Sequence, residues 1–274
     1  MKKVSIFILS ILSGILLSQN TRFVYEVTMK SDSTASPTIE NAYLDVSGDK
    51  SVFYGENRLK RDSVMQRAFQ TRTFNFDRSQ MEQFRTLINY QIDKNISEQK
   101  VTFKNRIGRD LYAYDEDRAL SWKILLETSV IGDYKVQKAE TDFAGRKWQA
   151  WFTQDVPMMD GPYKFYGLPG LIVKIEDSQN HYSFDLKETK SIAELPNLQQ
   201  MGNTVAVKRK DYDKQMEKYR KDPMATMQSG MMQGPPSGGR GGAGNAQNDA
   251  ERRKRMQERI EQEIKKNNNP LEKN

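Results

Sequence analysis

The sequence predicts a mainly β protein, built as a single curved antiparallel sheet or half-barrel with a few helices and a helical and disordered basic C-terminal tail. Apolar and polar residues alternate along many short segments, which is the side-chain period of a β-strand. Glycine-containing reversals separate these segments, and few helical patterns lie between them. The 274 residues include no cysteine, so burial of apolar side chains alone has to stabilise the fold.

Residues 1–18 have the pattern of a signal peptide. Lys2 and Lys3 precede a short apolar run, and small or polar residues follow it near Ser18. The run is shorter than the roughly 20 apolar residues that a spanning helix needs, so we favour a cleaved peptide over an uncleaved anchor. No cysteine follows the run as an acceptor for a lipid. We therefore expect an exported protein that is periplasmic, outer-membrane associated or secreted.

An antiparallel β domain is expected over residues 19–207. Residues 63–75 fit both a helix and extended chain, and their pattern does not decide between the two. The remaining periodic segments alternate clearly and are separated by turn residues. We expect strands at residues 21–30, 42–46, 51–54, 100–107, 111–115, 120–126 and 134–143.

The most regular alternation lies between Arg146 and Leu186. One face of the adjacent strands there is predicted to be dry, and the opposite face carries polar residues. The dry face should hold Trp148, Ala150, Phe152, Val173, Ile175, Tyr182, Phe184 and Leu186.

Glycine and proline bend the chain between these strands, at Gly161, Pro162, Gly167, Pro169 and Gly170. Proline presets the negative φ of the second position of a type II turn, and the following glycine takes the positive φ of the third. We interpret all five as structural turn residues rather than as a ligand-binding turn.

The stretch GPYKFYGLPGLIVKIED at residues 161–177, preceded by FAGRKWQAWFTQDVP, resembles the signature of the GLPGLI family of exported envelope proteins of Gram-negative bacteria. The resemblance extends more loosely to Asn268, Asn269 and Pro270. It implies an envelope protein whose activity is not established. Family members commonly carry a cysteine in the strand before the motif, where this chain has Val136, so any function of that thiol is missing here.

The C-terminal part changes character. Residues 208–222 are expected to form a charged helix that ends before Pro223. Residues 223–248 are rich in glycine and proline and have few apolar residues, which is typical of a disordered linker. Residues 249–274 are expected to form a basic helical tail, with a helix that Asp249 caps and that ends at Lys266.

Positive charge is concentrated in this tail. The chain has a formal net charge of +7, and residues 208–274 contain 16 lysine and arginine against 10 aspartate and glutamate residues. The tail fits a solvated helix with pairs such as Glu251–Arg255, or attraction to an anionic membrane surface. Export disfavours nucleic acid as a partner. Met256, Ile260 and Ile264 form a stripe that fits docking on a partner or on the sheet's own dry face.

Candidate binding residues cluster around the aromatic side chains of the motif. Trp151 lies off the predicted core face, and Tyr163 and Tyr166 follow it beside Arg146 and Lys164. Such rings stack on sugars, peptides or lipids, because aromatic faces are rigid and amphipathic. The alternative is a second small core under the loop that contains Gly161.

We predict no catalytic residue, no metal site and no cofactor. With no cysteine and with His181 as the single histidine, most metal centres and His-based triads are excluded. His181 and Asp185 share a strand face with Ser183, but four residues of strand separate them by roughly 13 Å. Glu176, Asp177 and Asp185 remain as carboxylates that fit hydrolysis only if two of them meet.

The sequence therefore favours an exported envelope protein that binds a hydrophobic ligand or another envelope protein without catalysis. A curved sheet with an open apolar face is similar to LolA-like carriers at the level of fold alone. One alternative is a structural or assembly partner of an outer-membrane complex, acting through the tail. The other is an envelope hydrolase with paired carboxylates.

Overall fold

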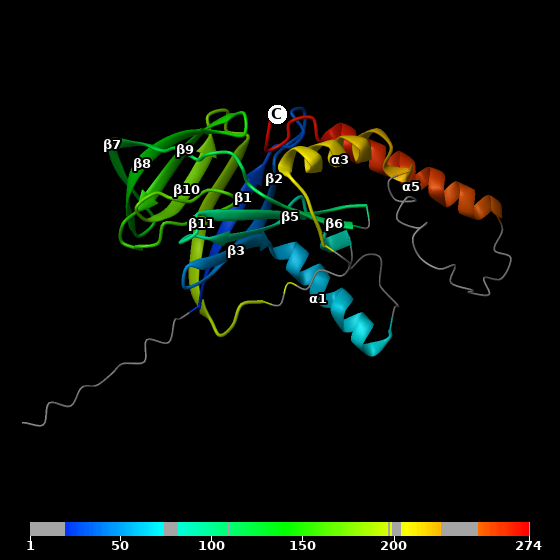
Figure 1. Cartoon of the computed structure of the whole chain (residues 1–274), viewed down its shortest axis with the longest axis horizontal. Helices are drawn as coiled ribbons and strands as arrows, with labels where there is room; N and C mark the ends of the chain where they lie inside the picture. Colours follow the sequence, from blue (N-terminus) through cyan, green and yellow to red (C-terminus); the bar gives the residue numbers. More distant parts are fainter. Residues whose placement is uncertain are drawn as a thin grey trace, which may run out of the picture.

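A computed structural model describes residues 20–73, 82–108, 110–196, 198, 204–225 and 246–273. Its strands form one sheet in the order β12-β6-β5-β4-β3-β2-β1-β11-β10-β9-β8-β7 (Figure 1). The predicted mainly β fold class is thereby confirmed. The predicted signal peptide and most of the predicted linker lie outside the described residues. The strands are β1 (Asn20–Met29), β2 (Thr38–Ser47), β3 (Lys50–Gly55), β4 (Gln91–Asn95), β5 (Lys100–Ile107), β6 (Asp110–Asp115), β7 (Lys123–Ile131), β8 (Tyr134–Phe143), β9 (Arg146–Thr153), β10 (Leu171–Asp177), β11 (Tyr182–Ile192) and β12 (Thr204–Ala206).

Neighbouring strands pair antiparallel, with β12 parallel to β6. β1 lies near the middle and pairs with β2 on one side and with β11 on the other. This pairing joins the N-terminal meander β1 to β6 to the C-terminal meander β7 to β11. Residues from both meanders consequently line a single core.

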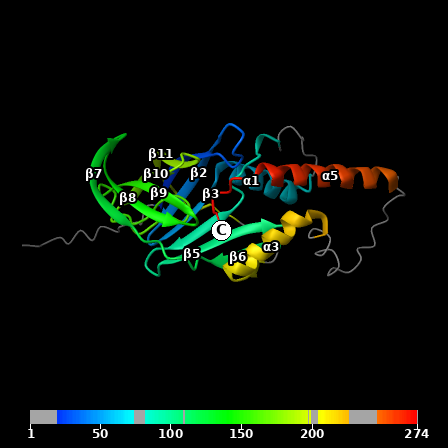
Figure 2. The same ribbon diagram turned by 90° about the horizontal axis from the view of Figure 1, so that it is seen from above.

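The sheet curves around this core, as the view from above shows (Figure 2). The loop at residues 154–170 enters the concave side, and its Phe165 is fully buried. The Phe165 ring lies 4.8 Å from that of Trp148, 5.8 Å from that of Phe143 and 6.4 Å from that of Phe184 between centroids. The predicted dry face is confirmed for β9 and β11, because their alternate residues belong to the core cluster or pack against it.

β10 departs from the predicted pattern. A β-bulge between Ile172 and Lys174 places Ile172 opposite Phe152 in the register, so Val173 is the extra residue of the bulge. Val173 is buried but lies outside the core cluster that contains Ile172 and Ile175. The prediction that Val173 shares the core face of Ile175 was therefore wrong, because a bulge interrupts the period of two.

The turn before β10 also differs from the predicted type II turn. The N–H of Gly170 donates to the carbonyl of Leu168 at 2.7 Å, which closes a three-residue turn around Pro169. The N–H of Leu171 donates to Val156 instead. Gly170 has a φ of 149°, and a Cβ there would lie 1.9 Å from the carbonyl oxygen of Thr153. Glycine is required because the backbone of β9 passes directly beside it.

Three further segments differ from the sequence-based expectations. The undecided residues 63–75 belong mostly to helix α1 (Glu56–Thr71). Strand β4 was not predicted. The strand expected at 120–126 begins later, at Lys123, and Trp122 lies before it with its indole N–H on the carbonyl of Tyr166 at 2.8 Å.

Two helices follow the sheet, α3 (Arg209–Lys221) and α5 (Ala246–Lys266). They lie beside each other at one end of the sheet, and α5 reaches outward from it (Figures 1 and 2). After Lys266 the chain turns back to the sheet. None of the helices in the described ranges is both long and apolar enough to cross a membrane.

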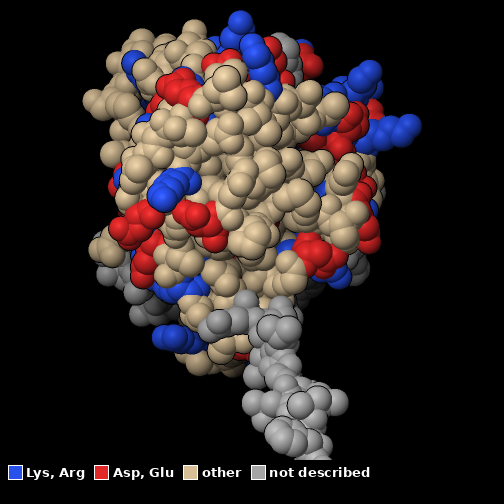
Figure 3. All heavy atoms as spheres, turned by 90° about the vertical axis from the view of Figure 1, so that its left-hand side faces the viewer, with Lys and Arg blue, Asp and Glu red and all other residues tan. Residues whose placement is uncertain are grey.

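Edge strand β7 closes the opposite end of the sheet and exposes apolar side chains. Leu126 is 97% exposed and Val130 is 67% exposed. Uncharged residues cover most of the centre of the face at this end, with charged residues around them (Figure 3).

Candidate functional site

The C-terminal segment, defined as residues 267–273, lies in a groove on the body of the protein. The Asn269 N–H donates to the carbonyl of Ser31 at 2.8 Å, and its side-chain amide donates to the carbonyl of Lys30 at 2.6 Å. The Tyr182 hydroxyl donates to the Asn269 carbonyl at 2.6 Å. Asn269 is buried. The segment is thus held as a peptide would be, through main-chain and side-chain bonds together.

Arg146, the first residue of β9, donates hydrogen bonds to three consecutive residues of the segment. Its guanidinium donates to the Oδ1 of Asn269 at 2.7 Å, to the carbonyl of Pro270 at 2.6 Å and to the carbonyl of Leu271 at 2.9 Å. Asp177, at the end of β10, accepts from its Nη1 at 2.7 Å. The planar fork of arginine makes all of these bonds at once, which a lysine could not do.

Lys164 forms a second cation site, 18 positions further along the chain. Its Nζ lies 4.7 Å from the ring centroid of Phe103 and 5.0 Å from that of Tyr114. It donates to Tyr114 at 2.9 Å and to the carboxylates of Glu116 and Glu272 at 2.6 Å each. A buried ammonium is stable only when its donors are paired in this way.

Glu272 brings the carboxylate of the C-terminal segment into this cation site. It accepts from Arg118 at 2.8 Å, from Lys164 and from the hydroxyl of Tyr163. Burial opposes ionisation of Glu272, but the two cations and their hydrogen bonds outweigh it, so the pKa of this carboxyl is lowered. Burial likewise opposes ionisation of Glu116, and Arg118 and Lys164 lower its pKa to about 2.

The Ala144-Gly145 turn between β8 and β9 forms the wall beside Lys273. Both residues have positive φ, 50° and 73°, which fits the type I′ turn of a two-residue hairpin. The Lys273 N–H donates to the Ala144 carbonyl at 2.8 Å. A Cβ on Gly145 would lie 2.4 Å from the Lys273 carbonyl oxygen. The C-terminal segment therefore passes close to this turn and requires glycine there. We define the docking groove as Ala144, Gly145, Arg146, Tyr163, Lys164 and Tyr182.

Three of the five predicted binding residues meet in the docking groove, namely Arg146, Tyr163 and Lys164. The other two lie elsewhere. Trp151 is half-buried on the opposite side of β9, with the Lys138 ammonium 5.5 Å from its ring centroid. The Tyr166 hydroxyl donates to the carbonyl of Gln99 at 3.4 Å.

Sequence reasoning missed the partners that the groove residues bind. The composition of residues 249–274 predicts a basic tail and gives no separate role to Asn269 or Glu272, and no motif marks Arg118. The available signal was the loose resemblance at residues 268–270, which lies far along the chain from the strands of the motif.

The predicted turn residues enclose a buried ion pair. Asp160, next to Gly161, contacts the ammonium of Lys94 on β4, and both side chains are fully buried. Lys94 also donates to the carbonyls of Gly161 and Phe165. Burial lowers the pKa of Lys94, and Asp160 opposes that shift. Lys94 thereby fixes the loop at residues 154–170 to the N-terminal meander.

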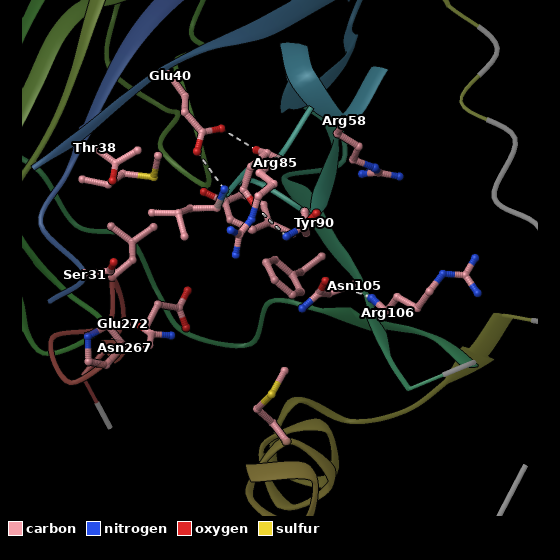
Figure 4. A pocket seen from close by; sticks show the side chains of 18 of the residues that line it. Ser31, Thr38, Glu40, Arg58, Arg85, Tyr90, Asn105, Arg106, Asn267 and Glu272 are labelled. Carbon is pink, nitrogen blue, oxygen red and sulfur yellow. Dashed lines mark hydrogen bonds between the residues drawn. The ribbon is translucent and has the colours of Figure 1, made fainter. Parts of the chain in front are cut away.

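A cleft of about 1660 Å³ opens beside the docking groove, between the sheet and helices α1, α3 and α5. Figure 4 shows Tyr90, Asn105 and Glu272 around it. Phe103, Tyr163, Tyr182 and Tyr212 add aromatic surface, and Ile260 and Ile264 of the predicted α5 stripe also line it.

Arg58 of α1 lies at the wall of this cleft. Its side chain is 5% exposed, and its Nη2 donates to Gln91 at 3.3 Å. Its Nη1 is one of the buried side-chain polar atoms that have no hydrogen-bond partner within the described chain. Burial lowers the pKa of this guanidinium, and Asp62 partly opposes the shift. An unsatisfied buried donor is costly, so a ligand acceptor at this point would stabilise it.

The carboxylates considered for hydrolysis do not form an isolated pair. Glu176 and Asp185 lie 2.8 Å and 3.9 Å from Lys174, and Asp177 is bound to Arg146. Asp185 also accepts from the hydroxyl of Ser183. The side chain of His181 makes no hydrogen bond to Ser183 or Asp185. Across the part of the chain that the structure describes, no three acidic or histidine side chains gather as a metal site.

Comparison with known proteins finds a family model that matches the motif region and solved structures with a similar fold. A family model described as a protein of unknown function (Porph_ging) matches residues 143–174, which include most of the docking groove. Two structures of PNGF-II share 16% and 17% identity, with a TM-score of 0.53, over 74% of this chain and 34% and 33% of theirs. The chain thus spans about a third of PNGF-II, and the likeness shows the fold alone.

A LolA superfamily protein from Nitrosomonas europaea has 9% identity and a TM-score of 0.28, over 66% of this chain and 89% of that one. This likeness is too weak to support a functional conclusion. No curated protein matches the chain.

Proposed function

We propose that the chain is an exported, non-catalytic binding protein of the GLPGLI family, located in the periplasm or at the outer membrane. Its ligand is a molecule with an extended apolar surface, or an apolar segment of another envelope protein. The observation that carries this proposal is the open cleft between the sheet and helices α1, α3 and α5.

Apolar side chains in the cleft are exposed to water. Phe69 of α1 is 46% exposed and Leu87 is 45% exposed, and both line the cleft. Exposed apolar surface inside a concave site is typical of ligand pockets, because binding removes it from water. The aromatic side chains of Tyr90 and Phe103, stacked at 5.4 Å, extend this surface inward.

Polar groups in the cleft would orient a ligand. The buried Nη1 of Arg58, which has no hydrogen-bond partner among the described residues, is a donor at the wall, and Asn105 lies beside the Tyr212 hydroxyl at 2.9 Å. An apolar body with one anionic or hydrogen-bond-accepting group matches this lining. An amphiphile, such as a lipid or a fatty acid, has that chemistry.

The first experiment extracts the purified mature protein with organic solvent and identifies copurified ligands by mass spectrometry. A fluorescent fatty-acid probe then measures binding to the wild type and to the variants Phe69→Ser and Leu87→Ser. We expect roughly ten-fold weaker binding in each variant, because each loses apolar contact.

Leu126→Ser is the matched control, since Leu126 is exposed on β7 outside the cleft. It should bind the probe as the wild type does. Absence of copurified ligand together with equal probe binding by all four proteins would refute the proposal.

The structure weakens the deletion test of the alternative in which the tail binds an outer-membrane complex. This test requires a tail that can be removed while the body stays intact. Asn269 and Glu272 of the tail, however, are bound to Arg146 and Lys164 of the docking groove. Deleting the tail therefore perturbs the body as well, so loss of a complex in such a variant would not identify the tail as its contact surface.

A further inference from the structure

The outer edge of strand β7 is open to another strand. Within the described sheet β7 pairs with β8 alone, so the backbone N–H and C=O groups on its other side have no strand partner. The strand is nine residues long and contains no proline, a residue with which many edge strands prevent such pairing. It lies at the end of the sheet opposite helices α3 and α5, which leave it uncovered (Figure 1).

One face of β7 exposes apolar side chains although it continues the core face of the sheet. The register places Ile124 opposite the core residue Ala139, and it places Thr128 opposite the residue two positions before Ala139. Both therefore face the core side, and the alternation adds Leu126 and Val130 to this face. Ile124 is 46%, Leu126 97% and Val130 67% exposed. Apolar surface of this kind is typical of an interaction site.

We propose that β7 pairs antiparallel with β7 of a second copy of this chain, around a two-fold axis at Thr128, so that the two sheets become one. In this register Leu126 of each copy lies opposite Val130 of the other, and Lys123 of each lies opposite Asp133 of the other. The proposal goes beyond the proposed ligand binding and does not depend on the cleft, which lies at the other end of the sheet.

Opposite charges at the two ends of β7 fit this pairing. Lys123 begins the strand, Asp133 lies in the turn that follows it, and both are exposed. Neither belongs to an ion pair within the described part of the chain. The two-fold axis brings Lys123 of each copy to Asp133 of the other, which makes the edge complementary to itself. An axis at Glu127 would instead place two carboxylates directly opposite each other.

The bulge in β7 favours the same register. Residues 125–127 oppose Lys138 alone on β8, so this half of the strand bows away from β8 toward the open edge. An axis at Leu125 would bring the two bows against each other. The axis at Thr128 places each bow against the straight half of the other strand, so the bulge selects the register.

A hollow of about 580 Å³ beside Val130 offers room for the most exposed side chain of the strand. Thr128, Val130 and Phe152 are among the residues that line it. Leu126 of the second copy lies opposite Val130 in the proposed register, so it meets this hollow. Figure 3 looks onto this end of the molecule and shows an uncharged centre with charged residues around it. An apolar centre with a charged rim is the usual composition of a protein interface.

Charge reversal tests the register with the variants Lys123→Glu and Asp133→Lys. Each variant alone places like charges opposite each other in a homodimer, so we expect about ten-fold weaker dimerisation than in the wild type. Their equimolar mixture should form a heterodimer, because both of its contacts join opposite charges. The double variant Lys123→Glu, Asp133→Lys keeps the wild-type net charge and should dimerise as the wild type does. Sedimentation velocity over about 1 to 100 µM, a range suited to a small interface, measures each.

Leu126→Asp tests the apolar contact. It brings a carboxylate to the hollow of the second copy, so we expect no dimer up to about 100 µM. Val205→Asp is the matched control, because Val205 is 38% exposed on β12, the opposite edge of the same sheet. This control should dimerise as the wild type does. Far-UV circular dichroism verifies that each variant is folded.

Three results would overturn the proposal. A wild type that stays monomeric over the whole range would exclude a second copy as the occupant of the edge. A dimer that Leu126→Asp leaves unchanged would show that another surface joins the copies. Failure of both the mixture and the double charge variant to restore dimerisation would exclude the antiparallel register around Thr128.

Discussion

Phe165 lies among the aromatic side chains of the C-terminal meander, and its carbonyl accepts from Lys94 of the N-terminal meander. Its ring contacts Trp148, Phe143 and Phe184, which come from three different strands. We expect Phe165→Ala to lower the free energy of unfolding by roughly 3 to 5 kcal/mol, because it leaves a cavity among aromatic rings. Urea unfolding followed by tryptophan fluorescence measures the change. The half-exposed Phe69 is the control, and an equal loss in Phe69→Ala would contradict the central position of Phe165.

The Lys94–Asp160 pair gives a second expectation at a single residue. Lys94→Met should destabilise the protein by roughly 3 to 5 kcal/mol, because it leaves the Asp160 carboxylate buried without a cation. The double variant Lys94→Met, Asp160→Leu removes both charges and should recover most of that loss. Thermal unfolding of the wild type and the single and double variants tests this. If the double variant is no more stable than Lys94→Met, the unpaired charge of Asp160 is not the cause of the loss of stability.

At this scale the sequence singles out three residues of the candidate site, and their role in binding stays a prediction. Arg146, Tyr163 and Lys164 belong to one local motif, so their spacing marked them. Glu272 lies 108 positions after Lys164, and no local period connects the two. The pairing depends on how the chain returns to the sheet, which is a tertiary property.

Among the elements, β9 and β11 were predictable because their alternation is regular. β4 was not, because Gln91 and Lys94 occupy buried positions and hide the apolar period. α1 was equally obscure, since Arg58 and Ala68 are its buried residues and no apolar stripe marks the helix. The bulge in β10 shows the same limit, because one inserted residue reverses the side-chain pattern without a local signal.

The C-terminal segment should respond to acid. Glu116 has a pKa of about 2 in the folded protein against 4.5 unfolded, and the pKa of Glu272 is also lowered. A lowered carboxyl pKa contributes stability that is complete above the unfolded value and is lost as pH falls through the folded value. Stability should therefore decrease between pH 4.5 and about 2. Urea unfolding at pH 7, 5, 4 and 3 should show a smaller decrease in Glu272→Gln than in the wild type.

Removal of the segment should affect the whole body. A chain that ends at Lys266 loses the bonds from Asn269 and Glu272 to Arg146 and Lys164. We expect roughly 3 to 5 kcal/mol lower stability, the usual result when one partner of a buried charge pair is removed. Differential scanning calorimetry checks this against Lys254→Ala, a change at an exposed position of α5. A melting temperature equal to that of the control would show that the segment rests on the surface only.

For the molecule as a whole, one core implies one cooperative transition. Trp122, Trp148 and Trp151 all lie in or next to the C-terminal meander, whereas α1 belongs to the N-terminal one. Tryptophan fluorescence and the helical signal at 222 nm should thus give the same urea midpoint. Two midpoints would show that the helices α1, α3 and α5 do not unfold together with the C-terminal meander.

The fold class followed from the sequence because alternation and turns recur across the body. The position of the cleft did not, since it forms between helices and a sheet that are far apart along the chain. Its lining mixes apolar, aromatic and basic residues from six or more elements, and no single stretch carries its pattern.

The separation of Lys164 and Glu272 along the chain also determines when their ion pair can form during synthesis. At ribosomal speeds of about 5 to 20 residues per second, 108 positions correspond to roughly 5 to 20 s of synthesis. β10, β11 and β12 are synthesised within that interval, and the cation of Lys164 lacks one of its two carboxylates until the interval ends. Nascent chains of increasing length should consequently acquire full protease resistance only after residue 273 has left the ribosome.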